Sequence, residues 1–184
     1  KPVARKIPAD PPANRNAPHY KYKIKSRYFN FIVKRLNGQT YEPGLGGDEN
    51  SAVLHALIRY EPSNPESADL RYGDVIVLSG RIYDGKDTFW TMLSLPNRTS
   101  DSAYYNEFKK DPGENELLVV KSLPFVMGAF VNPEKSSVYP REYYPILLQK
   151  RSSGNFMQEL EGKRISCFDN TKNTGVFWYF YPTE

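Results

Sequence analysis

Alternation of apolar and polar residues is clearest between residues 70 and 95, where two strand-like segments flank a turn dipeptide. Residues 74–83 are rich in Val, Ile and Tyr, and residues 88–95 are rich in Thr, aromatic residues and Leu. Asp84-Gly85 lies between them, and glycine supplies the positive φ angles that tight hairpin turns need. The first segment is apolar on both faces, which is typical of a strand covered on both sides. The pattern therefore predicts a hairpin in the middle of a sheet.

Similar residue types continue along the chain and predict further strands. They occur at residues 51–60, 116–120, 125–131, 146–150, 164–168 and 176–181, the last two segments forming a closing hairpin. A short helix is predicted at 101–110, where Asp or Ser can cap its start and Asp-Pro-Gly ends it, and a helical turn at 156–160. No internal repeat is visible. About eight to nine strands with irregular connections predict a mainly all-β fold, an antiparallel sandwich of jelly-roll type or a barrel, with one or two short helices.

The N-terminal segment differs from the rest in proline content and in charge. Residues 1–18 contain five prolines and no periodic apolar pattern, which predicts an extended arm before a single β domain at residues 19–184. Residues 1–36 carry ten basic groups and one acidic group, a net of +9, whereas the remaining residues carry 15 basic and 20 acidic groups, a net of −5. Basic arms on mildly acidic bodies usually bind polyanions, nucleic-acid backbones above all.

A row of lysines follows the arm in a strictly alternating segment. Tyr20, Tyr22 and Ile24 face one way and the lysines between them face the other, at a spacing of about 7 Å. Such a row can follow a phosphate backbone, or it can protect an edge strand against aggregation. The first interpretation makes the candidate nucleic-acid contacts Lys1, Arg5, Lys6, Arg15, Lys21, Lys23, Lys25 and Arg27.

Aromatic clusters suggest a surface that another subunit covers. In residues 176–181 both faces of the predicted strand are aromatic, and a subunit interface is a natural cover for the second face. We therefore expect a homo-oligomer. The candidate interface residues are Trp178, Phe180, Tyr143 and Tyr144.

The residues that common catalytic and metal sites need are scarce. Cys167 is the single cysteine, which excludes an intramolecular disulfide and a four-thiolate metal site. The two histidines are His19 and His55, and the apolar surroundings of His55 predict a hydrogen-bonded core histidine. No HExxH, GxSxG or CxxC motif occurs, and no run of about 18 apolar residues predicts a membrane span. We expect a protein that is not an enzyme and that binds no metal or cofactor.

The layout of an arm before a β domain resembles that of the coat subunits of small icosahedral viruses. The resemblance implies a structural capsid protein of the virion, whose arm contacts DNA or RNA through the backbone without sequence preference. On this hypothesis the near-neutral body forms the contacts between subunits, and no part of the chain spans a membrane.

Three other hypotheses place the protein outside a virion. The stretch at 72–82, YGDVIVLSGRI, resembles a strand of oligonucleotide-binding barrels, which implies a single-stranded nucleic-acid-binding protein. Continued to residue 95, it resembles a strand pair of galectins, which implies a carbohydrate-binding sandwich, although the His, Arg, Trp and Glu pattern of that family does not follow downstream. The third hypothesis is an accessory subunit whose arm threads through a larger complex.

Overall fold

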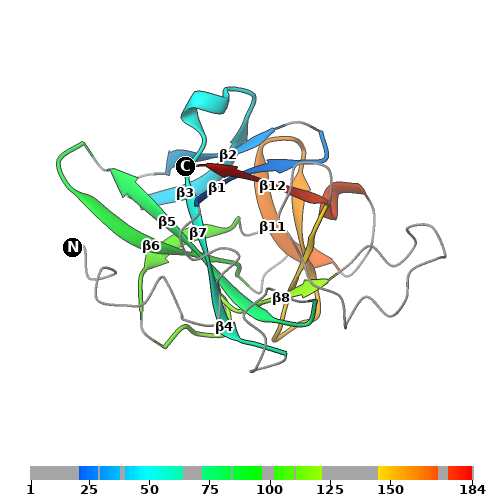
Figure 1. The fold of residues 1–184 in the computed structure, drawn as a ribbon. Coiled ribbons are helices and arrows are strands. Elements are labelled where there is room, and N and C mark those ends of the chain that lie inside the picture. The colour runs from blue at the N-terminus through cyan, green and yellow to red at the C-terminus, as the bar shows by residue number, and fades with distance from the viewer. Residues whose placement is uncertain are drawn as a thin grey trace.

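The structure of the protein is a computed structural model that describes residues 21–28, 30–37, 40–63, 72–83, 85–96, 102–109, 111–121, 145–169 and 174–183. The predicted arm, the predicted strand at 125–131 and the candidate interface residues Tyr143 and Tyr144 lie outside these residues. Within them the chain forms strands, with two short 3-10 turns (Figure 1). None of the helices in the described part is long and apolar enough to cross a membrane.

The described residues form twelve strands and two 3-10 turns, all of them short. The 3-10 turns are η2 (Glu49–Ser51) and η4 (Thr174–Val176). The strands are β1 (Lys21–Ser26), β2 (Phe31–Asn37), β3 (Thr40–Gly46), β4 (His55–Glu61), β5 (Val75–Tyr83), β6 (Thr88–Ser94), β7 (Tyr104–Glu107), β8 (Leu118–Lys121), β9 (Leu147–Lys150), β10 (Phe156–Leu160), β11 (Arg164–Asp169) and β12 (Trp178–Thr183).

All twelve strands belong to one antiparallel sheet that closes on itself. Its pairings run β12-β1-β2-β3-β11-β10-β9-β8-β5-β6-β7, and β4 joins β5 back to β1. Nine strands therefore form a closed ring, in the order β1, β2, β3, β11, β10, β9, β8, β5 and β4. The strands β6, β7 and β12 are attached to this ring. Of the two architectures that the sequence predicts, the chain forms the barrel.

The register of the strand pairs shows a threefold repeat. Three strand pairs meet in the same way, with Tyr22 opposite His55, Ile76 opposite Leu118, and Ile146 opposite Trp178. The next pairs around the ring also match, with His55 opposite Gly80, Leu118 opposite Lys150, and Trp178 opposite Ser26. We call β1–β4, β5–β8 and β9–β12 the first, second and third repeats, and the contact from β4 to β5 or from β8 to β9 a junction.

The repeat escapes sequence analysis because equivalent positions share backbone pairing and little chemistry. One equivalent position in β1, β5 and β9, for example, is occupied by Ser26, Gly80 and Lys150. Each repeat also contributes one hairpin: β2–β3, β6–β7 or β10–β11. The hairpins meet one another, since Arg164 pairs with Gly44 and the Ala103 amide donates to the Ile165 carbonyl. The expectation of no internal repeat is therefore wrong at the level of structure.

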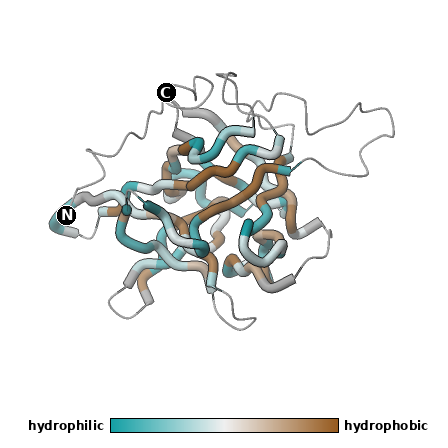
Figure 2. Tube along the Cα trace, turned by 90° about the horizontal axis from the view of Figure 1, so that it is seen from below, coloured by the Kyte–Doolittle hydropathy of each residue, from teal (hydrophilic) through white to brown (hydrophobic). Residues whose placement is uncertain are grey.

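The core fills the barrel and confirms the alternation predicted for the first strand. Tyr22 and Ile24 are buried, while Lys23 and Lys25 lie on the outer face of β1. Apolar residues of the ring strands from all three repeats form one buried cluster. Figure 2 shows hydrophobic stretches running through the middle of the molecule. Burial of this area is the main stabilising term for such a fold.

Both predicted helical segments are strands. Residues 104–107 form β7, in which Tyr105 pairs with Leu93 of β6, and residues 156–160 form β10, which pairs with β11. Cap and turn residues favoured a helix locally, but pairing and burial of Tyr105 outweigh that weak preference. The 3-10 turns lie elsewhere, before β4 and before β12.

Of the two predicted hairpins, one is confirmed and the other is wrong. The central one is confirmed, because β5 pairs with β6 from Ser79–Met92 to Tyr83–Thr88. The predicted closing hairpin is wrong, since β11 pairs with β10 and β3, and β12 pairs with β1. The C-terminal strand therefore pairs with the first described strand instead of with its neighbour in sequence.

Candidate functional site

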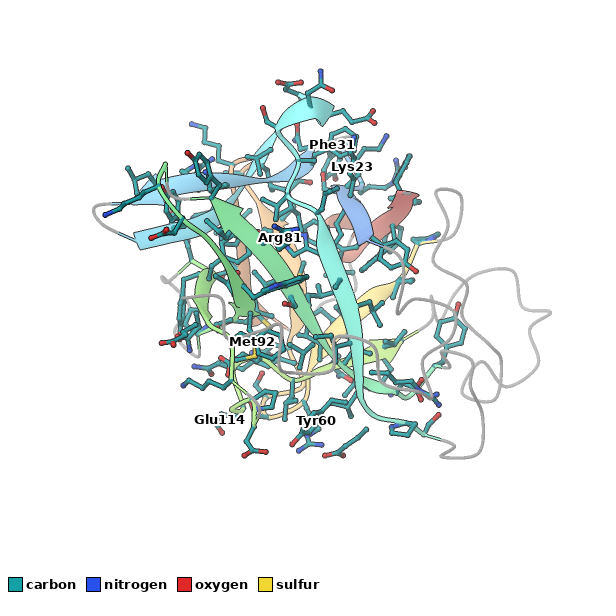
Figure 3. All side chains as sticks on the ribbon, turned by 60° about the vertical axis from the view of Figure 1, so that its left-hand side comes forward. Lys23, Phe31, Tyr60, Arg81, Met92 and Glu114 are labelled. Atoms are coloured by element: carbon teal, nitrogen blue, oxygen red, sulfur yellow. The ribbon has the colours of Figure 1, made fainter. Side chains whose placement is uncertain are left out.

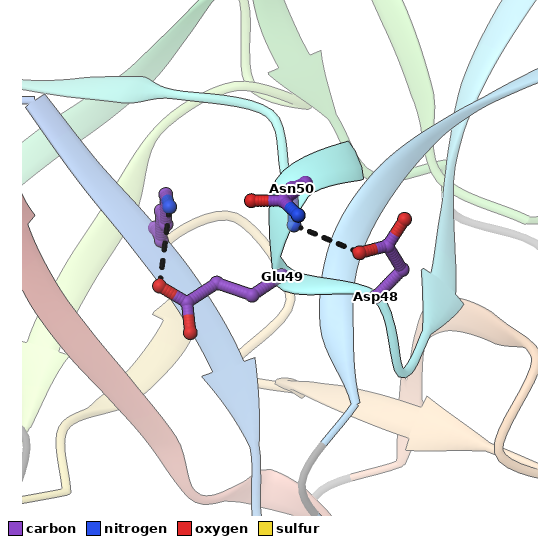
Figure 4. A network of polar contacts seen from close by, with 4 residues as sticks. Asp48, Glu49 and Asn50 are labelled. Atoms are coloured by element: carbon purple, nitrogen blue, oxygen red, sulfur yellow. Dashed lines mark hydrogen bonds and ion pairs between the residues drawn. The ribbon is translucent and has the colours of Figure 1, made fainter.

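The predicted lysine row lies on one face of β1, but its described ammonium groups are engaged. Lys23 Nζ donates to Glu49 Oε2 at 3.2 Å (Figure 4). Lys25 Nζ lies 5.4 Å from the Phe31 ring centroid and 4.8 Å from that of Tyr181. The ion pair with Glu49 offsets the charge of Lys23, whereas the ring contacts of Lys25 orient its ammonium without neutralising it.

The other candidate nucleic-acid residues are placed only in part. Arg27 is exposed in the turn after β1, and Lys21 pairs through its backbone with Thr183 and Ala56. The candidates Lys1, Arg5, Lys6 and Arg15 lie outside the described residues.

The turn η2 holds Glu49 in place for its contact with Lys23. Asp48 Oδ1 accepts from the backbone N–H of Asn50 at 3.0 Å (Figure 4). The other carboxylate oxygen of Asp48 accepts from the Ser51 hydroxyl at 2.9 Å. This is the usual role of an aspartate that caps a helical turn. The two acidic groups of this turn are therefore satisfied locally.

The candidate interface residues Trp178 and Phe180 are core residues. Both are 0% exposed within this one chain. Trp178 Nε1 donates to the Met157 carbonyl at 2.9 Å, and the Phe180 ring contacts the Tyr22 ring edge to face at a centroid distance of 5.6 Å. The prediction of an interface is wrong for these two rings, because the turn of β12 toward β1 buries the face that the sequence left uncovered.

A surface pocket of about 340 Å³ opens at the junction between the first and second repeats. Its walls come from β2, from the segment between η2 and β4, and from the last residues of β5. The lining residues are Lys34, Ser51, Ala52, Val53, Leu54, Arg81, Ile82 and Tyr83.

The rim of the pocket combines an aromatic ring, an aliphatic side chain and two cations. Tyr83 is 54% exposed and Leu54 is 36% exposed. Lys34 Nζ donates to the Tyr83 carbonyl, and Arg81 Cζ lies 5.8 Å from the Trp90 ring centroid. In the view of Figure 3, Arg81 lies on β5 below Lys23 and Phe31. The alternation of β5 explains the rim, since Ile82 is buried and its two neighbours point outward.

A buried polar pair lies behind the pocket wall. His55 Nε2 and the Tyr105 hydroxyl are 3.0 Å apart, and the two rings stack. Burial lowers the pKa of His55 to about 4 and raises the pKa of Tyr105 above its ordinary value. The imidazole is therefore neutral at neutral pH. The prediction of a core histidine is confirmed, and its hydrogen bonding is confirmed for Nε2, whereas Nδ1 is buried without a hydrogen-bond partner among the described residues.

The junction between the second and third repeats is filled by a buried lysine. Lys150 Nζ donates to the Leu95 carbonyl at 2.6 Å and to Asn115 Oδ1 at 2.9 Å. Burial lowers the pKa of Lys150, opposed by the nearby Cys167, Glu114 and Glu116. The Lys150 ammonium has no contact with solvent, so its role at this junction is structural.

The described part of the chain offers few groups for catalysis or metal binding. The Cys167 thiol donates to the Asn155 carbonyl, and burial raises the pKa of Cys167 to about 11, so the thiol is protonated at neutral pH. Among the described residues, no three His, Cys, Asp or Glu side chains are grouped so as to hold a metal ion.

Sequence analysis missed the pocket because its residues come from three segments far apart in the chain. The alternation of Arg81, Ile82 and Tyr83 on the central hairpin was the available signal, since it predicts two outward side chains around an inward one. The contribution of Lys34 and of residues 51–54 depends on the pairing of β1 with β2 and β4, which the sequence does not reveal.

No protein-family model matches the chain, and no curated protein matches it in sequence. Solved structures are similar in fold. The S. cerevisiae protein O-mannosyltransferase Pmt1-Pmt2 complex bound to the sugar donor has a TM-score of 0.60 and 12% identity, over 90% of this chain and 25% of that one. A Polyporus squamosus lectin bound to a human-type influenza-binding epitope has a TM-score of 0.51 and 14% identity, over 88% of this chain and 48% of that one.

A designed threefold symmetric protein, ThreeFoil, has a TM-score of 0.51 and 16% identity, over 88% of this chain and 97% of that one. Thus the chain spans less than two thirds of the first two proteins and nearly the whole of the designed one. Identities this low show a shared fold alone. The threefold register and the three hairpins agree with that likeness, and the fold is β-trefoil-like.

Proposed function

We propose that this protein is a carbohydrate-binding module, and that the pocket at the first junction is its ligand site. The observation that carries the proposal is the exposed Tyr83 ring beside Lys34, Arg81 and Ser51 at one concave site. Concave sites with an apolar wall and a few convergent polar groups are the usual small-ligand sites of proteins. A sugar ring presents C–H groups on its faces and hydroxyls at its edges, which suits this combination.

The pocket is held in shape before any ligand arrives. The Tyr83 hydroxyl donates to the Gly85 carbonyl at 2.8 Å, and Lys34 Nζ of β2 donates to the Tyr83 carbonyl. Both contacts fix the turn of the β5–β6 hairpin and the direction of the Tyr83 ring. A preformed site loses less conformational entropy on binding, which favours weak polar ligands such as saccharides. The likeness in fold to a lectin also supports the proposal.

Replacement of the exposed ring tests this proposal. In a glycan array followed by titration calorimetry of the full-length chain, Tyr83→Ala should weaken binding of the best saccharide by about tenfold or more, because a stacked ring contributes on the order of 1 to 3 kcal/mol. Tyr28→Ala is the matched control, since Tyr28 is 59% exposed and lies in the turn between β1 and β2. Equal losses in both variants, or the absence of any saccharide binding, would contradict the proposal.

A second proposal follows from the charge asymmetry of the sequence. The net charge of +9 over residues 1–36 still supports a coat-type subunit whose arm contacts nucleic acid. Size-exclusion chromatography with light scattering, read at 260 and 280 nm, tests it. A large particle that carries nucleic acid, and that loses it on deletion of residues 1–18, would favour this proposal over the carbohydrate module, and a monomer without nucleic acid would exclude it.

A further inference from the structure

We infer that the pocket selects a negatively charged saccharide, carrying a carboxylate or sulfate group, through Arg81 and Lys34. This inference rests on the proposed carbohydrate-binding function and names the class of ligand. Two features support it: the contacts of the equivalent arginines in the repeats, and the charges of the groups around the pocket.

Each repeat has an arginine directly after the same ring position. The register that aligns Ser26, Gly80 and Lys150 makes Arg27, Arg81 and Arg151 equivalent. Arg151 Nη1 forms an ion pair with Glu61 Oε1 at 2.7 Å. Arg81 has no carboxylate partner within the part of the chain that the structure describes, and its contact there is with the Trp90 ring. A ring contact orients a guanidinium and leaves its donor edge for an anion.

Lys34 adds a second cation on the opposite wall. Its Nζ donates to the Tyr83 carbonyl and lies 4.9 Å from the Tyr41 ring centroid, and neither contact neutralises its charge. None of the described residues that line the pocket is acidic. The closest acidic groups in η2 are engaged, because Glu49 pairs with Lys23 and Asp48 caps the turn. Two uncompensated cations at one site favour a carboxylate or sulfate, which accepts charge-assisted hydrogen bonds from both.

The geometry favours a compact anionic group over a polyanionic strand. A volume of about 340 Å³ accommodates one or two sugar units and no extended backbone. A single-stranded nucleic acid needs a basic groove and a row of exposed rings, whereas Tyr83 is the one exposed ring among the described residues that line this pocket, and Lys23 is paired with Glu49. The same chemistry would suit a sialic or uronic acid and a sulfated sugar, and an array separates them.

The second junction is filled where the first is open. Leu117 is equivalent to Leu54 and is 5% exposed, against 36% for Leu54. Lys150 fills the space there and bonds to Asn115, the equivalent of the pocket residue Ala52. We therefore expect one acidic saccharide per chain at these two junctions.

The test uses the full-length chain and a glycan array whose members are paired by the presence or absence of one sialic acid, uronic acid or sulfate group. Wild type should bind the acidic member of a pair at least about tenfold more tightly, and Arg81→Ala and Lys34→Ala should each remove most of that preference. Arg151→Ala, the equivalent substitution at the filled junction, should leave it within about twofold. Titration calorimetry of the best acidic glycan should give a stoichiometry near one.

Three outcomes would overturn the inference. If neutral and acidic members bind equally and Arg81→Ala changes nothing, the charge selection fails while carbohydrate binding stands. If no saccharide binds, the proposed function fails as well. If a single-stranded oligonucleotide displaces the glycan and its own binding is lost in Arg81→Ala, the pocket is a nucleic-acid site.

Discussion

The two junctions of the barrel have the same backbone register and opposite contents. At the first, His55 pairs with Gly80 and a pocket remains at the surface, whereas at the second, Leu118 pairs with Lys150 and the lysine fills the space. The strand lengths also differ, because β5 continues through Arg81 to Tyr83 and β9 ends at Lys150. A repeated backbone thus offers equivalent positions, and side-chain size at one ring position together with strand length decides whether a ligand site forms.

The largest effect in this comparison is expected from removing the lysine that fills the second junction. Lys150→Met should lower the free energy of unfolding by about 4 kcal/mol, because the Leu95 carbonyl and Asn115 Oδ1 lose their buried donor and Glu116 loses a nearby cation. Urea denaturation at neutral pH measures it. Saccharide binding at the first junction should persist at temperatures where the variant is folded, and a variant as stable as wild type would show that the lysine contributes no net stability.

The next effect is a pH dependence of the stability that arises at the first junction. The folded chain holds His55 neutral down to about pH 4, whereas the unfolded chain protonates it below 6.5. The unfolded state therefore binds more protons in this window, and stability should fall by about 3 kcal/mol as the pH decreases from 6.5 to 4. The double variant His55→Leu with Tyr105→Phe makes the first junction apolar, as Leu118 does in the second, and should lose this part of the pH dependence. Urea midpoints at pH 7, 5.5 and 4 measure it, and an unchanged slope would contradict the assignment.

A smaller effect is expected at the glycine that keeps the first junction open. A Cβ at Gly80 would lie 3.3 Å from Val53 Cγ1 and 3.4 Å from His55 Cδ2. Gly80→Ala should therefore cost about 1 to 2 kcal/mol and weaken saccharide binding, since Val53 lines the pocket and must shift. Gly47→Ala is the control, because nothing lies within 4 Å of its Cβ. Thermal unfolding and calorimetry measure the two effects, and equal results in both variants would refute this packing argument.

The smallest effect concerns the ion pair beside the second junction. The side chains of Arg151 and Glu61 are 43% and 52% exposed, so solvent screens their attraction. Arg151→Ala should change the free energy of unfolding by about 0.5 kcal/mol or less, and high salt should reduce even that difference. Thermal melts at two salt concentrations measure it. A loss above about 1.5 kcal/mol would show that the pair is coupled to the fold more strongly than its exposure indicates.

Sequence patterns predicted the elements whose identity depends on local chemistry. The central hairpin, the alternation of Tyr22 and Ile24 with lysines, and the core role of His55 all follow from the order of residues along short segments. Elements whose identity depends on partners were predicted poorly. The segment of β7 carries helix-start signals, and it is a strand because β6 offers a free edge and the core accepts Tyr105.

The sequence by itself determined that this chain is mainly β and which residues of β1 face inward, because the two-residue period of a strand is local. It also determined the charge asymmetry between residues 1–36 and the rest. Only the tertiary structure decided that three unlike segments share one register, that Trp178 and Phe180 belong to the core, and that Lys34, Arg81 and Tyr83 meet at one pocket. The physical reason is that each of these depends on pairing between strands far apart in the chain, which closure of the barrel imposes and which no single segment encodes.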